Sequence, residues 1–183
     1  NNSKPSVNST EGVLYCEIAA LANDTSLRAV SLYETTANIN NLVTIHYNTT
    51  SQGLRFLYRQ GSASIADFNV VLTDIKQVNK IAGFWKQNEF KLFVNGVKVA
   101  EQLSGNVATS GAFKLLAFDS ASLGRYFYGK VKGLAVYNEA LSESQLMQLT
   151  GVTASSIYNN FVTRTASFTV EALNEVKKVI DNL

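Results

Sequence analysis

The stretch EFKLFVNGVKVAEQ, residues 89–102, decides how we expect this chain to fold. Apolar and polar side chains alternate on both sides of Asn95-Gly96, which is the pattern of two strands joined by a tight turn. Asn-Gly readily adopts the positive φ angles of a type I′ turn, whose twist matches that of antiparallel strands. The stretch therefore predicts a β-hairpin.

A second informative stretch is YFYGKVKGLAVYNEALSESQLMQL, residues 126–149, a long strand that runs into a short helix. Ser142 begins a capping box, in which its side chain caps the helix start and Gln145 reaches back to it. Gly151 is expected to end the helix, and Gly129 to let the strand bend or pass a bulky neighbour. We expect the helix to pack on the sheet through its leucines: Leu141, Leu146 and Leu149.

Short apolar runs separated by clusters of Asn, Thr, Ser and Gly continue through the rest of the chain, a spacing typical of β-sandwiches. Side chains alternate between the faces of a strand, so Phe56 and Tyr58 point one way and Arg55 and Arg59 the other. One face goes to the core and the other to water or a ligand. The expected strands are residues 13–20, 28–33, 42–47, 54–59, 64–72, 77–86, 90–95, 97–102, 112–118 and 126–137.

These stretches resemble the second half of a laminin-G-like, or concanavalin-A-like, jelly-roll domain. In that family a strand similar to KIAGFWKQ (80–87) precedes a hairpin similar to LFVNG (92–96). Its closing element resembles FYGKV (127–131) followed by Tyr137-Asn138 and LSESQ (141–145). The resemblance implies an all-β, antiparallel jelly-roll sandwich with a short capping helix. EGVLYCEIAALAND and VTIHYNTT are also similar to versions found in bacteriophage tail and virion appendage proteins.

Three regions follow from this pattern. Residues 1–10 are polar and without period, which predicts an N-terminal arm or linker. Residues 11–151 form the jelly roll, and residues 152–183 a C-terminal extension whose apolar side chains at 167–183 have helical spacing. That helix packs on its own sandwich or joins another copy or a further domain, and both alternatives stay open. Since the sequence starts at Asn1 without Met, we expect a processed product or part of a longer polypeptide.

Composition excludes several classes of partner. The net charge of +2 is spread along the chain, so nucleic acid is not expected as a partner. Apolar runs are too short for a membrane-spanning helix, so membrane insertion is not expected either. Cys16 is the single cysteine, which excludes an intrachain disulfide or a cysteine zinc site and favours a buried core thiol.

No catalytic pattern stands out, and we predict that the chain is not an enzyme. Glycan hydrolases of this fold class carry carboxylates two residues apart on one strand, whereas the carboxylates here are isolated on separate expected elements. The only histidine, His46, has no acid or cysteine partner near it in sequence. A cofactor is not expected. If calcium binds, Asp24 and Asp119 are the candidates, although a turn-forming role is favoured for both.

Sugar-binding jelly rolls stack aromatic rings on pyranoses and place a few polar groups at hydroxyls. The competing interpretation is that Trp85 and about half of the tyrosines pack in the core or at its rim. The candidate ligand-binding residues are Tyr33, His46, Tyr47, Arg55, Tyr58, Arg59 and Trp85.

The function favoured by these patterns is a non-catalytic structural or adhesive module of a virion appendage, such as a phage tail fibre, spike or head-associated protein. Its partners would be a host-surface glycan, other virion proteins or further copies of itself through the C-terminal segment, and its location the virion or the extracellular space. The alternative is a secreted bacterial carbohydrate-binding module of a surface protein or polysaccharide-degrading enzyme.

Overall fold

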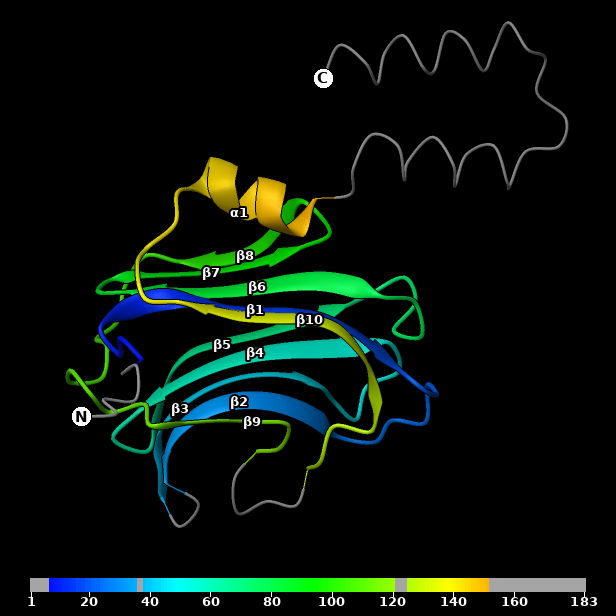
Figure 1. Cartoon of the computed structure of the whole chain (residues 1–183), viewed down its shortest axis with the longest axis horizontal. Helices are drawn as coiled ribbons and strands as arrows, with labels where there is room; N and C mark the ends of the chain where they lie inside the picture. Colours follow the sequence, from blue (N-terminus) through cyan, green and yellow to red (C-terminus); the bar gives the residue numbers. More distant parts are fainter. Residues whose placement is uncertain (1–6, 36–37, 121–124, 152–183) are drawn as a thin grey trace, which may run out of the picture. The chain divides into compact units, whose positions relative to one another are not determined.

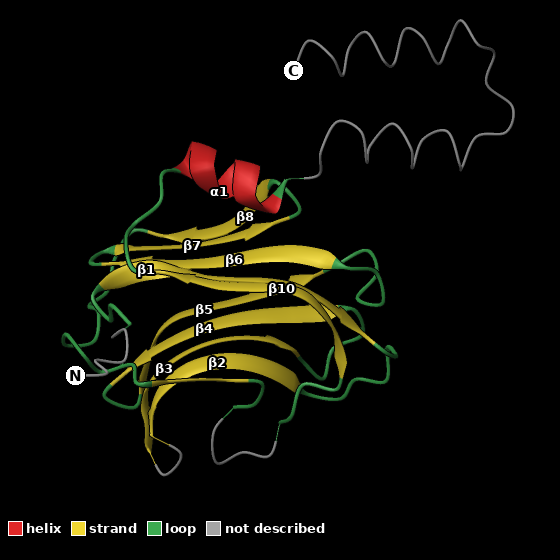
Figure 2. Cartoon of the chain, in the orientation of Figure 1, coloured by secondary structure: helices red, strands yellow, loops and turns green. Residues whose placement is uncertain are grey.

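A computed structural model describes residues 7–35, 38–120 and 125–151 of the chain. This part folds into two five-stranded sheets, and every paired strand is antiparallel to its neighbour. Sheet A has the order β10-β1-β6-β7-β8 and sheet B the order β5-β4-β3-β2-β9. The sheets lie face to face, and helix α1 covers the outer face of sheet A (Figures 1 and 2). The predicted jelly-roll sandwich is confirmed.

The ten strands that the sequence predicts are all present, with small shifts at their ends. The largest shifts concern the third strand, which begins at Asn38, the ninth, which shortens to three residues, and the tenth, which begins at Gly129. The elements are β1 (Glu11–Ala20), β2 (Arg28–Thr35), β3 (Asn38–Tyr47), β4 (Gly53–Gln60), β5 (Ala63–Val71), β6 (Asn79–Lys86), β7 (Glu89–Val94), β8 (Val97–Gln102), β9 (Leu115–Ala117), β10 (Gly129–Tyr137) and α1 (Glu143–Thr150).

The Asn95-Gly96 turn joins β7 and β8 as expected. Its φ angles are 50° at Asn95 and 84° at Gly96, both in the left-handed region that a type I′ turn requires. The side-chain oxygen of Asn95 accepts a hydrogen bond from the Lys80 N–H at 2.9 Å. The Gly96 N–H donates to the Thr150 hydroxyl at 3.2 Å, so the turn is tied both to β6 and to the end of α1.

The capping box of α1 is formed as predicted. The Gln145 N–H donates to the Ser142 hydroxyl at 3.3 Å, and the Ser142 N–H donates to the Gln145 side chain at 2.8 Å. Leu146 is fully buried against Phe84 and Phe93 of sheet A. This contact, with partly buried leucines on either side of it, fixes the helix on the outer face of sheet A.

Gly129 marks a close approach, also as expected. A Cβ at this position would lie 2.5 Å from the Ala19 carbonyl and 2.7 Å from the Phe127 ring. Any larger residue would therefore push β10 away from β1 or displace the Phe127 ring.

An aromatic cluster fills one end of the space between the sheets. The Tyr58 ring lies 5.1 Å from that of Phe90 and 6.3 Å from that of Trp85, between ring centroids. The Tyr58 hydroxyl donates to the Ser9 carbonyl at 3.0 Å and accepts from the Ala108 N–H at 2.8 Å. Ser9 is fully buried. Ser9, within the predicted N-terminal arm or linker, thus completes this buried network.

Contacts divide the chain into two units, Asn1–Thr150 and Gly151–Leu183. The predicted helix at 167–183 and residues 1–6 lie outside the described residues. Within the described part, no helix is long and apolar enough to cross a membrane.

Candidate functional site

The outer face of sheet B is concave, since β2 and β3 bow toward sheet A (Figure 1). Neighbours in the strand register point to the same side of a sheet, so three rows of side chains cross this face. The inner-face residues between these rows, such as Val30, Ile45 and Phe56, are fully buried in the core. The rows are Ala29, His46, Arg55 and Asn69; then Ser31, Thr44, Leu57 and Asp67; then Tyr33, Leu42 and Arg59.

Three arginines give the face its charge. Arg55 donates from Nε and Nη2 to the two oxygens of Asp67, at 2.7 and 2.6 Å. This bidentate pair lowers the pKa of Asp67 and raises that of Arg55. Arg59 and Arg125 form no ion pair with any described residue. Asp67 neutralises one of the three arginines, so this face carries more positive charge than the Arg55–Asp67 pair accounts for.

Arg125 comes from the chain between β9 and β10. Its carbonyl accepts a hydrogen bond from the Ala29 N–H at 3.2 Å, which places it beside the first row. Burial, and then the charges of Arg55 and Arg59, lower the pKa of the Arg125 guanidinium. The three guanidinium groups thus share one electrostatic environment, although they are far apart in sequence.

His46 lies in the middle of the first row and is only 1% exposed. Burial, followed by the charges of Arg55 and Arg125, lowers its pKa from 6.5 to about 4, so the imidazole is neutral at pH 7. Its Nε2 has no hydrogen-bond partner in the described part of the chain, and neither has the buried Nε of Arg59. Buried polar atoms are rarely left unpaired, so each of these two atoms requires an explanation.

An apolar strip lies beside these polar groups. Tyr33, Leu42 and Leu57 are 2%, 3% and 4% exposed and pack together, with Ala117 against them. The Tyr33 hydroxyl donates to Asp119 at 3.2 Å. The strip is therefore buried, and polar side chains reach solvent on this face, which suits a small polar ligand: Arg55, Arg59, Asp67 and Asn69.

Four of the seven predicted ligand-binding residues lie on this face, and three do not. Tyr33, His46, Arg55 and Arg59 belong to its rows. Tyr47, Tyr58 and Trp85 are fully buried between the sheets, so they are removed from the candidate site. Strand alternation is the reason, because it sends these three rings to the inner faces of β3, β4 and β6, where packing is their role.

The two calcium candidates do not form a common site. The two oxygens of Asp24 each accept a hydrogen bond from Arg28 at 2.8 Å, and this pairing holds the pKa of Asp24 well below its usual range. Asp119 contacts Tyr33 instead. Among the described residues, no group of three or more His, Cys, Asp or Glu side chains is arranged to hold a metal ion.

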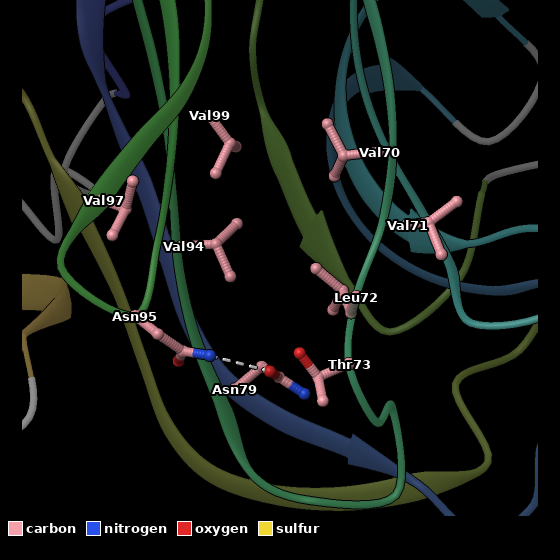
Figure 3. A pocket seen from close by; sticks show the side chains of 9 residues that line it. All are labelled: Val70, Val71, Leu72, Thr73, Asn79, Val94, Asn95, Val97 and Val99. Atoms are coloured by element: carbon pink, nitrogen blue, oxygen red, sulfur yellow. Dashed lines mark hydrogen bonds between the residues drawn. The ribbon is translucent and has the colours of Figure 1, made fainter. Parts of the chain in front are cut away.

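A groove of about 290 Å³ opens between the edge strands β5 and β8 (Figure 3). Valines and a leucine line most of it, and Val71 and Val97 are 70% and 59% exposed. The Asn95 amide donates to Asn79, and the Asn79 amide donates to backbone carbonyls, so these polar groups are already engaged. The groove therefore lacks the polar groups that the face of sheet B offers.

Sequence reasoning missed two members of the site. Arg125 lies in a connection without periodicity, so nothing local places it near Arg55. Asp67 was expected to be an isolated surface carboxylate, whereas the register of β4 with β5 brings it to Arg55. Alternation in β5 was the one usable signal, because it separates Asp67 from the inward-facing Ala66 and Phe68.

Two antiparallel five-stranded sheets stacked face to face define a jelly-roll sandwich (Figure 1). Residues 18–147 match the sequence model described as the Concanavalin A-like lectin/glucanases superfamily, and the chain belongs to this superfamily. No curated protein sequence matches the chain significantly.

Solved structures share the fold at low sequence identity. The CBM40 module of a Ruminococcus gnavus IT-sialidase has a TM-score of 0.62 and 17% identity, over 79% of this chain and 85% of that one. The same module bound to α2,3-sialyllactose has a TM-score of 0.61 and 16% identity, over 80% and 84%. The NanB sialidase of Streptococcus pneumoniae has a TM-score of 0.60 and 16% identity, over 79% of this chain but 25% of the enzyme. At such identities the likeness concerns the fold.

Proposed function

We propose that the concave face of sheet B binds an acidic sugar of a glycan, with the sugar carboxylate at the arginines. The observation that carries this proposal is the unpaired charge of Arg59 and Arg125 beside the Arg55–Asp67 pair. A guanidinium presents parallel N–H donors that match the two oxygens of a carboxylate, and such charge-assisted bonds are stronger than neutral ones. A carboxylate on this face also offsets the mutual repulsion of the arginines.

The remaining groups of the face suit the rest of a sugar ring. Asn69 is exposed in the same row as Arg55, so its amide is available to hydroxyl groups of the ring. His46, Tyr33 and Leu57 are buried, so they support the face from beneath and do not contact the sugar. One sialidase-associated module with this fold is described with α2,3- and with α2,6-sialyllactose bound, which makes sialic acid the first acidic sugar to test.

We assign no hydrolytic role to this face. Asp67 is held by both oxygens to Arg55, and its lowered pKa disfavours the protonated form that a general acid needs. The proposed role is therefore recognition without bond cleavage.

Two settings suit such a module. A secreted or surface-attached carbohydrate-binding module has the greater support, because a fold neighbour is the CBM40 module of a sialidase. The hypothesis of a virion appendage that attaches to a host glycan rests only on two stretches, EGVLYCEIAALAND and VTIHYNTT, that resemble bacteriophage tail and virion appendage proteins. Both settings place the protein outside the cell or on a virion.

The test is calorimetric titration of the full chain with 3′-sialyllactose and, in parallel, with lactose. We expect binding of the acidic sugar and at least tenfold weaker binding of lactose. Arg59→Gln and Arg125→Gln should each weaken 3′-sialyllactose binding by about 10- to 100-fold, the value of a charged hydrogen bond of ~1.5–3 kcal/mol.

The matched control is Lys86→Gln. It also removes one positive charge, but from an exposed side chain at the end of β6 in sheet A. It should leave the affinity unchanged, and added salt should weaken binding by the wild type more than binding by the arginine variants. Equal affinity for lactose and sialyllactose, or no binding of either, contradicts the proposal.

A further inference from the structure

Next to the arginines, the segment before β10 exposes two aromatic rings that the proposed carboxylate site does not use. Tyr126 and Tyr128 are 54% and 67% exposed, and their ring centroids lie 6.3 Å apart in an edge-to-face arrangement. Between them, Phe127 turns inward and packs 6.3 Å from the Tyr47 ring of the core. Two of three consecutive aromatic side chains are thus left in solvent.

The backbone that carries these rings is firmly held. The Phe127 N–H donates to the Phe118 carbonyl at 2.8 Å, and Arg28 Nε donates to the Tyr128 carbonyl at 2.9 Å. Arg28 is itself buried and paired with Asp24 at 2.8 Å. Because the anchors are already formed, a ligand that stacks on the tyrosines does not have to order this backbone first.

The two tyrosines follow Arg125, a residue of the proposed site, in the sequence. Arg125 and Tyr126 are adjacent in sequence, so their Cα atoms are about 3.8 Å apart. The Arg125 guanidinium shares the field of Arg55 and Arg59, while the Tyr126 ring faces solvent. One short segment therefore carries both a cation that acts on the concave face and two exposed aromatic rings next to it in sequence.

We propose that Tyr126 and Tyr128 form a second subsite, on which the neutral sugar linked to the acidic sugar stacks. The inference rests on the proposed function and makes it more specific: the ligand is the acidic end of an oligosaccharide and not an isolated acidic monosaccharide. A pyranose has a C–H face that packs on an aromatic ring, and Tyr adds a hydroxyl for the ring substituents. The Asp24–Arg28 ion pair then has a role in this subsite. It holds the Arg28 side chain that donates a hydrogen bond to the Tyr128 carbonyl.

The experiment compares N-acetylneuraminic acid with 3′-sialyllactose by calorimetry on the full chain. We expect the wild type to bind the oligosaccharide about five- to tenfold more tightly, the gain that an aromatic contact of ~1–1.4 kcal/mol provides. In Tyr126→Ala/Tyr128→Ala the ratio of the two affinities should fall to about one. In Tyr126→Phe/Tyr128→Phe, which keeps both rings, most of the ratio should remain.

Leu103→Ala is the matched control, since Leu103 is 69% exposed on the β8–β9 connection. Its affinity ratio should equal that of the wild type, and the melting temperatures of all variants should agree because the substituted side chains are exposed. Monosaccharide binding without a gain from the second sugar, or a gain that survives the alanine variant, overturns the subsite alone. Failure of the wild type to bind either the monosaccharide or the oligosaccharide refutes the proposed function and the subsite with it.

Discussion

The stability of the folded protein between pH 7 and pH 5 should depend on one residue, His46. It is the only histidine in the chain, and its pKa falls from 6.5 to about 4 on folding. In this window the unfolded chain binds a proton that the folded protein excludes, so stability decreases as the pH falls. The loss should be ~2 kcal/mol between pH 7 and pH 5. Below the folded pKa the contribution levels off.

Urea unfolding of the full chain, followed by tryptophan fluorescence, measures this loss. Trp85 is the single tryptophan and is buried in the core, so its emission reports the unfolding of the jelly roll. The free energy should fall by ~2 kcal/mol from pH 7 to pH 5, with an unchanged slope on urea. Asp67 and Asp24, whose pKa values are lowered, contribute above their unfolded value of 3.8 and lose this contribution only at lower pH.

The control is His46→Asn, which removes the titrating group. This variant is less stable at pH 7 but should show almost no change down to pH 5. A wild-type free energy that stays constant over the window would refute the reasoning, because it would mean that the buried imidazole accepts a proton as easily as in the unfolded chain. An equal decrease in the variant would assign the effect to other groups.

Two further predictions concern the fold. Tyr58→Phe should lower the free energy of unfolding by about 1–3 kcal/mol, since it leaves the buried Ala108 N–H without its acceptor, and calorimetric melting measures the change. Gly96→Ala, at a φ of 84°, should cost about 1–2 kcal/mol in urea unfolding, because the left-handed region disfavours a Cβ. A variant as stable as the wild type at either position would contradict the role given to that hydroxyl or turn.

The candidate site was only partly readable from sequence. Alternation along residues 54–59 correctly separated Arg55 and Arg59 from Tyr58. The same rule assigns Tyr47 and Trp85 to the core, in agreement with the competing interpretation of the aromatic residues as core packing. Arg125 could not be assigned to the site from sequence. Its position beside Ala29 depends on a backbone hydrogen bond between residues that are 96 positions apart, 125 − 29.

The sequence by itself determined the local structure of this protein: the Asn95-Gly96 turn, the Ser142 capping box and the two-residue period of each strand. These features depend on φ preferences, nearby hydrogen-bond partners and alternation, all of which act within a few residues. Only the tertiary structure decided which side chains meet on the concave face. Strand order and register bring Arg55, Arg59 and Arg125 into one electrostatic environment, and that proximity comes from long-range pairing that no short stretch encodes.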